Sequence, residues 1–87
     1  MKATVYVTLK QGVLDPQGKA VQQALVSLGF DSVKNVRQGK LIEIELSEVL
    51  EGTEVSREET ETLLKDMCEK LLANTVIENY RIETSND

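Results

Sequence analysis

The sequence predicts an α+β fold in which two helices cover one face of an antiparallel sheet, in the order β-α-β-β-α-β. Three observations support this prediction: a strictly alternating N-terminal segment, two helical segments with start and stop signals, and three further extended runs. The chain has 87 residues, of which 40% are hydrophobic and 29% charged, with a net charge of -5. This composition is globular. We therefore expect one domain spanning residues 1–87, with residues 85–87 frayed.

The first strand is predicted from Lys2 to Lys10, where apolar and polar residues alternate as they do in a strand with one buried face. Asp15 and Pro16 then mark the start of a helix, because Asp is a favoured N-cap and Pro suits the first helical position. The apolar stripe of this helix is Val21, Ala24, Leu25 and Leu28. Gly29 ends the helix as the left-handed residue of a Schellman cap.

Two short extended runs follow, Ser32 to Arg37 and Leu41 to Leu46. The turn Gln38-Gly39-Lys40 between them predicts a hairpin in which Gly39 takes a positive φ. The second run alternates clearly, whereas the apolar residues of the first are three apart and fit a strand only with a bulge or bend.

The second helix is predicted to open at Ser56, because Ser56 and Glu59 form a capping box. Residues 48–55 before it form an exposed connection. The inward stripe of the helix is Leu63, Leu64, Met67, Leu71 and Leu72. Asn74 can cap the end of the helix in the left-handed conformation, and Val76 to Glu83 is the last strand. This order is that of the ferredoxin-like fold, and it leaves one sheet face open for another subunit.

Missing residue types exclude several functions. There is no His, so an imidazole base, a Cys-His or Ser-His pair and a His-containing zinc site are all excluded. Cys68 is the only cysteine and cannot form an internal disulfide, which predicts a reducing, cytoplasmic location. Its place beside Leu64 and Leu72 favours a small core residue over a reactive thiol. No apolar run is long enough to cross a membrane, no signal peptide is recognisable, and the acidic balance argues against nucleic acid as a partner.

Few residues are candidates for a site. The loop from Lys10 to Val13 could cradle an anion, but turn geometry explains its glycine better. Arg37 and Lys40 bring two cations to one turn, where they could grip a partner's carboxylate or a phosphate, or remain solvated.

The acidic residues of the strands could in principle form a metal or acid-base cluster, although alternation along the strands explains Glu43 and Glu45 as a solvated face. Glu78 differs because it falls on what should be an apolar side. Either a bulge turns it outward or it meets a cation on another chain. No catalytic, cofactor-binding or metal-binding set is therefore predicted.

Three strings in the sequence, read together, carry a family resemblance. They are Leu9-Lys10-Gln11-Gly12-Val13-Leu14-Asp15-Pro16-Gln17-Gly18, Val36-Arg37-Gln38-Gly39-Lys40 and Leu71-Leu72-Ala73-Asn74-Thr75-Val76-Ile77-Glu78-Asn79-Tyr80. The chain resembles the PurS family, small subunits of phosphoribosylformylglycinamidine synthase in purine biosynthesis. The resemblance runs from Ala3 to about Glu83, and Thr75 stands where many relatives have Pro.

The resemblance implies a noncatalytic subunit that self-associates, as a dimer or a dimer of dimers, and joins a large synthetase subunit to a glutaminase subunit. The glutaminase releases ammonia from glutamine. The synthetase uses ATP and magnesium to activate the formamide oxygen of formylglycinamide ribonucleotide, and ammonia displaces it. Assembly, and help in transferring ammonia, are the expected roles of the small subunit, which itself needs no cofactor.

The resemblance also suggests roles for single residues. Contact with a partner is expected at Arg37, Lys40, Glu78 and Tyr80. Caps and turns are expected at Asp15, Gly18, Gly29, Gly39 and Asn74. The alternative function is a ferredoxin-like regulatory module that binds a small metabolite at a dimer interface.

Overall fold

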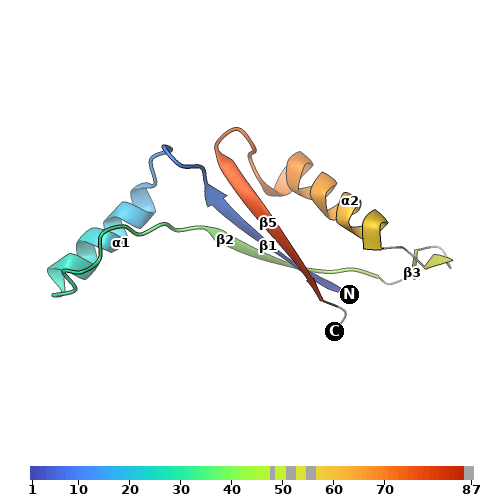
Figure 1. Cartoon of the computed structure of the whole chain (residues 1–87), viewed down its shortest axis with the longest axis horizontal. Helices are drawn as coiled ribbons and strands as arrows, with labels where there is room; N and C mark the ends of the chain where they lie inside the picture. Colours follow the sequence, from blue (N-terminus) through green and yellow to red (C-terminus); the bar gives the residue numbers. More distant parts are fainter. Residues whose placement is uncertain (48, 51–52, 55–56, 86–87) are drawn as a thin grey trace.

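A computed structural model describes residues 1–47, 49–50, 53–54 and 57–85 of the chain (Figure 1). Its main sheet has three antiparallel strands in the order β2-β1-β5. The central strand is β1 (Lys2–Leu9), flanked by β2 (Lys40–Glu45) and β5 (Glu78–Ser85). The helices are α1 (Pro16–Ser27) and α2 (Arg57–Met67), and α2 continues as the π-helical segment η1 (Cys68–Leu72). The α+β class and the alternating order of elements are confirmed.

The buried face of the sheet is the one predicted from the alternation of β1. Ala3, Val5 and Val7 are at most 1% exposed, and α2 with η1 covers them through Leu64 and Cys68, both fully buried. Partly buried residues of the neighbouring strands and of η1 complete the core, namely Ile42, Ile44, Leu72, Tyr80 and Ile82. The core is thin and aliphatic, as expected for so short a chain.

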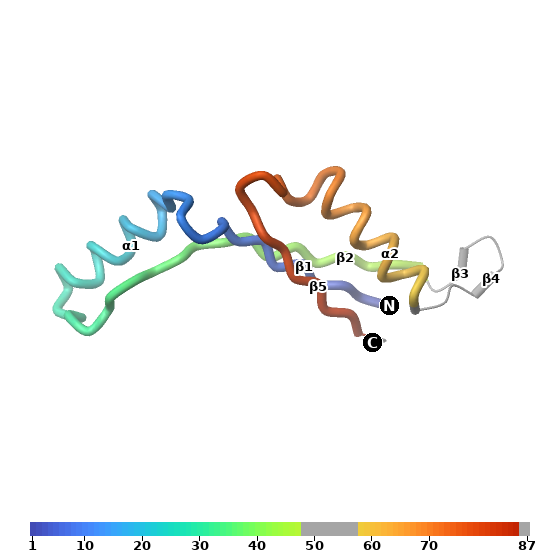
Figure 2. The backbone as a smooth tube through the Cα atoms, turned by 45° about the horizontal axis from the view of Figure 1, so that its top comes forward, coloured from blue at the N-terminus to red at the C-terminus, as the bar shows by residue number. Residues whose placement is uncertain are grey.

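The predicted strand from Ser32 to Arg37 is wrong. These residues form a turn followed by an irregular extended segment that runs back beside α1 to β2 (Figure 2). The physical reason is that β1 ends at Leu9, so this segment lies beyond the main sheet. The predicted hairpin at Gly39 is therefore wrong as well, and the described glycines with positive φ are Gly12 and Gly29.

The first helix lies beyond the end of the sheet, whereas α2 lies over one face of it (Figure 1). Of the two helices expected to cover one face of the sheet, α2 does so and α1 does not. The predicted stripe of α1 is accordingly open, with Val21 42% and Leu28 74% exposed. Helix propensity and caps fix where α1 begins and ends, but they do not fix what it packs against.

Smaller differences concern the connections. Residues 48–55 include two short paired strands, β3 (Val49–Leu50) and β4 (Thr53–Glu54). The predicted capping residue Ser56 lies outside the described residues. The last strand begins at Glu78 instead of Val76, because residues 75–77 form a turn, and Ser85 pairs with Lys2 rather than fraying.

Candidate functional site

The first group of candidate residues holds α1 to the extended segment that precedes β2. Asp15 accepts a hydrogen bond from the Gly18 backbone N–H at 2.9 Å, as the predicted N-cap, and a second from Gln38 at 2.8 Å. These two bonds, the one from Gln38 first, hold the pKa of the Asp15 carboxyl below its usual value. Arg37 donates to the carbonyl of Leu9 at the end of β1. The N-terminus of α1 is therefore tied to both flanking segments.

Two glycines of this group are needed for close approach. A Cβ on Gly18 would lie 2.3 Å from the carbonyl oxygen of Val36, and one on Gly39 would lie 2.4 Å from that of Val7. Both distances are well inside van der Waals contact, so any side chain would push the backbones apart. Gly39 serves contact with β1 rather than the hairpin turn that its sequence context suggests.

The end of α1 is built as predicted. Gly29 has φ +103°, its N–H donates to the carbonyl of Val26, and the N–H of Phe30 donates to that of Leu25. These are the two bonds of a Schellman motif.

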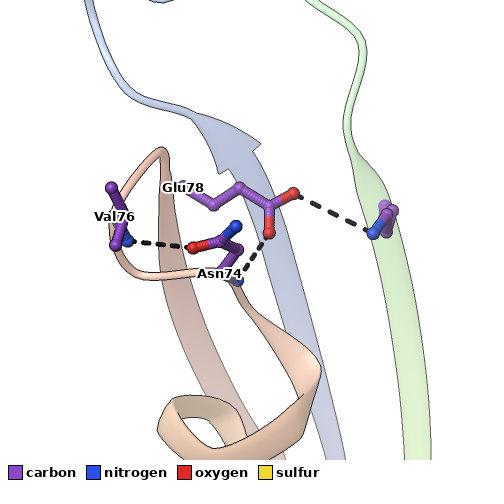
Figure 3. Close-up of polar contacts among 4 residues, drawn as sticks. Asn74, Val76 and Glu78 are labelled. Carbon is purple, nitrogen blue, oxygen red and sulfur yellow. Dashed lines mark hydrogen bonds and ion pairs between the residues drawn. The ribbon is translucent and has the colours of Figure 1, made fainter.

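The second group lies where η1 passes into β5 (Figure 3). The Asn74 side-chain oxygen accepts from the Val76 N–H at 3.2 Å, and the Asn74 N–H donates to Glu78 Oε1 at 2.7 Å. The other carboxylate oxygen of Glu78 lies 3.9 Å from Lys40 Nζ on β2. Asn74 and Glu78 therefore fix the turn together, and Lys40 joins this turn to the opposite edge of the sheet.

The geometry resolves the question raised by Glu78. Its side chain is 14% exposed and lies on the same side of β5 as Tyr80 and Ile82. No bulge turns it outward, and the cation that it meets, Lys40, belongs to the same chain. Contact of Arg37, Lys40, Glu78 and Tyr80 with a partner stays a prediction, but in the chain itself the first three already have the internal contacts described above.

Tyr80 and Cys68 are neighbours in the core. Burial, with smaller effects of Glu69 and Cys68, raises the pKa of Tyr80. Burial, with the nearby Glu69 carboxylate, likewise raises the pKa of the Cys68 thiol. A raised pKa keeps the thiol protonated, which agrees with the predicted role as a core residue.

The open sheet face carries a contact that the sequence did not suggest. The guanidinium of Arg81 lies 4.2 Å from the centre of the Tyr6 ring, and both Tyr6 and Arg81 contact Glu83. Tyr6 faces Arg81 across the β1–β5 pair, so the contact depends on the register of the strands. Outward positions on both strands were visible in the sequence, but the register was not.

Within the described part of the chain, no group of three or more acidic or cysteine residues could hold a metal ion. None of the described helices is long and apolar enough to cross a membrane. The side chains described above bind the chain to itself through caps, turns and ion pairs.

Comparison with known proteins identifies the family. The family model for PurS, described as phosphoribosylformylglycinamidine (FGAM) synthase, matches residues 2–86. The chain belongs to the PurS family. The phosphoribosylformylglycinamidine synthase subunit PurS of Bacillus subtilis is 52% identical over 82 residues, covering 94% of this chain and 89% of the relative. The subunit of the same name from Methanocaldococcus jannaschii is 45% identical, covering 94% of this chain and 92% of the relative. The predicted resemblance is confirmed.

Solved PurS structures share the fold. PurS of B. subtilis superposes with a TM-score of 0.77 at 52% identity, covering 94% of each chain. A chain in a structure of PurLQS from Thermotoga maritima superposes with a TM-score of 0.70 at 26% identity, covering 94% of this chain and 93% of that one. The fold is thus found both in PurS by itself and in an assembly with that name.

Proposed function

We propose that the chain is the noncatalytic small subunit of phosphoribosylformylglycinamidine synthase, which self-associates and holds the synthetase and glutaminase subunits together in the cytoplasm. The observation that carries this proposal is the similarity over nearly the whole chain to PurS proteins, including a chain of the PurLQS structure. In such an assembly ATP and magnesium would bind to the synthetase subunit. The small subunit would supply surface for contacts with the other two subunits.

The surface of the chain supports an assembly role. Large hydrophobic side chains are exposed on several elements, with Leu71 83%, Val76 80% and Leu28 74% accessible. These side chains would be covered in a complex, which also explains how so thin a core can belong to a stable protein.

Reconstitution tests the proposal. The synthetase and glutaminase subunits are mixed with and without this chain, and the mixtures are assayed with glutamine and, separately, with ammonium salt as the nitrogen donor. We expect omission of the chain to reduce both the size of the complex and glutamine-dependent amidine formation, while ammonia-dependent formation persists. Ammonium bypasses the glutaminase, so this pattern assigns the effect to coupling of the two subunits.

Two results would contradict the proposal. One is a complex whose size and glutamine-dependent activity are unchanged when the chain is left out. The other is saturable binding of an amino acid or nucleotide by the isolated chain in calorimetry, which would favour the regulatory module. Equal loss of both activities would locate the effect in the synthetase and argue against a role in ammonia transfer.

A further inference from the structure

One edge of the main sheet has no neighbouring strand in the described part of the chain. The strand order is β2-β1-β5, so β5 pairs with β1 on one side only. The Lys10 N–H donates to the Ile77 carbonyl at 2.8 Å, and these two residues continue the register of β1 and β5. Because hydrogen-bonded and non-hydrogen-bonded pairs alternate in an antiparallel ladder, residues 79, 81, 83 and 85 direct their backbone groups at β1.

The residues between them direct their backbone groups away from β1. The Glu78 N–H bends back to the Asn74 carbonyl at 2.7 Å. Tyr80, Ile82 and Thr84 thus present three N–H donors and three carbonyl acceptors on the outer side of β5, which we call the free edge.

The free edge lacks the features that normally block an exposed strand. The strand is eight residues long, its register with β1 runs from Glu78 to Ser85 without a bulge, and it contains neither Pro nor Lys. The two charged side chains on its open face, Arg81 and Glu83, pair with each other. A long, regular edge of this kind is a template for pairing with another chain.

A groove lies beside the free edge, between α2 and β5. Its volume is about 650 Å³, and we call it the edge groove; its lining residues are Glu61, Lys65, Tyr80, Ile82, Glu83 and Thr84. Glu83 lies on the opposite face of the sheet from the other three β5 residues, so the groove reaches round the edge. A strand added to β5 would lie at this position and direct every second side chain into the groove.

The charges of the edge groove indicate which kind of chain it fits. Two carboxylates, Glu61 and Glu83, and one ammonium group, Lys65, line it, and the whole chain has a net charge of -5. A second copy would bring the same negative charge to the edge, and self-repulsion of this kind keeps proteins apart. A segment of another protein with a Lys or Arg side chain facing the groove has the complementary charge.

We propose that the free edge of β5 binds an extended segment of a different subunit, which adds a fourth strand to the main sheet and places a Lys or Arg side chain in the edge groove. The proposal deepens the bridging role in the proposed function and rests on it. Main-chain hydrogen bonds to Tyr80, Ile82 and Thr84 provide the affinity, and the groove-facing side chains provide the specificity.

Amide hydrogen exchange of the unmodified chain tests the added strand directly. The chain is exchanged alone and in the reconstituted complex with the synthetase and glutaminase subunits, quenched, and analysed by NMR. In the chain alone we expect slow exchange at residues 79, 81 and 83 and fast exchange at Tyr80, Ile82 and Thr84. In the complex, the amides of the free edge should slow by at least about 100-fold.

Three results of this measurement would overturn the proposal. The first is a complex in which the free-edge amides still exchange fast, which would leave the bridging function standing. The second is slow exchange at the free edge of the chain alone that is lost on dilution, which means pairing with a second copy. The third is failure of the chain to join any complex, which would remove the bridging function as well.

Variants of Thr84 test the backbone and the charge separately. Thr84→Pro removes one outward N–H and leaves the ladder with β1 intact, so we expect it to weaken binding to the partner subunits about 10-fold in a fluorescence titration. Thr84→Ala is the matched control, because it also loses the hydroxyl group but keeps the N–H. Equal binding of the two variants would argue against strand addition. Thr84→Lys should weaken binding and Thr84→Glu should not, whereas the reverse order would mean an acidic segment and overturn the partner chemistry stated here.

Discussion

The carboxylate of Glu78 can be tested as an internal structural link, and its variants separate this role from contact with a partner. Glu78→Gln keeps an oxygen for the Asn74 N–H and removes the charge that faces Lys40. Glu78→Ala removes the 2.7 Å hydrogen bond as well. Lys40→Met keeps an aliphatic stem of similar length without the ammonium. Together these variants allow a double-mutant cycle across the β1 strand.

The magnitudes follow from the geometry. The Nζ–Oε2 distance is 3.9 Å, but Lys40 is 67% exposed, so the solvent screens the pair and its coupling energy should be about 0.5–1 kcal/mol. Loss of the hydrogen bond to the carboxylate adds about 1 kcal/mol, because Asn74 is exposed and water can replace part of the bond. We therefore expect Glu78→Ala to destabilise by about 1.5–2 kcal/mol in all, and Glu78→Gln by about half of that.

Urea unfolding at one fixed protein concentration, followed by circular dichroism, measures these differences. Glu43→Gln is the control, because Glu43 is an exposed carboxylate on β2 of the same sheet, and it should change stability by less than about 0.5 kcal/mol. The coupling between positions 40 and 78 should shrink in 1 M salt. Zero coupling at low salt would refute the internal ion pair, and normal stability combined with failed complex formation would assign Glu78 to a partner interface.

Three further predictions concern the groups that position the helices. Gly39→Ala should destabilise by about 1–3 kcal/mol in urea unfolding, because its Cβ would meet the Val7 carbonyl at 2.4 Å; an unchanged midpoint contradicts this close approach. Cys68 should react with thiol reagents only as fast as the protein unfolds, since it is fully buried with a raised pKa, and rapid labelling of the native chain would disprove its core placement. The lowered pKa of Asp15 predicts a contribution to stability that is present above about pH 4 and lost as the pH falls through the lowered value; Asp15→Asn should therefore flatten the acid side of a plot of Tm against pH, and an acid side identical to that of the parent would contradict this linkage.

Local patterns were sufficient for most of the elements. Alternation predicted β1 and its buried face, and Asp15, Pro16 and Gly29 predicted both ends of α1. These features depend on residues no more than about four positions apart, so the sequence states them directly. The absence of His is likewise a property of the sequence alone, and it favours a role in assembly over one in catalysis.

The place of each element in space depended on contacts between residues far apart in the sequence. Ser32 to Arg37 had a composition compatible with a strand, yet it lies past the end of β1 and has no strand of the described sheet to pair with. From the sequence, Glu78 needed either a bulge that turns it outward or a cation on another chain, but the pairing of β5 and β2 with β1 brings Lys40 of the same chain within 3.9 Å.

The sequence by itself thus determined where both helices and the strands of the main sheet lie, apart from shifts of a few residues at their ends, which face of each is apolar, and which family the chain resembles. Only the tertiary structure decided that α2 covers the sheet while α1 projects beyond it. The physical reason is that an apolar stripe specifies that a helix must be buried but leaves open against which surface, and that choice depends on strand lengths and on backbone contacts such as those of Gly18 and Gly39.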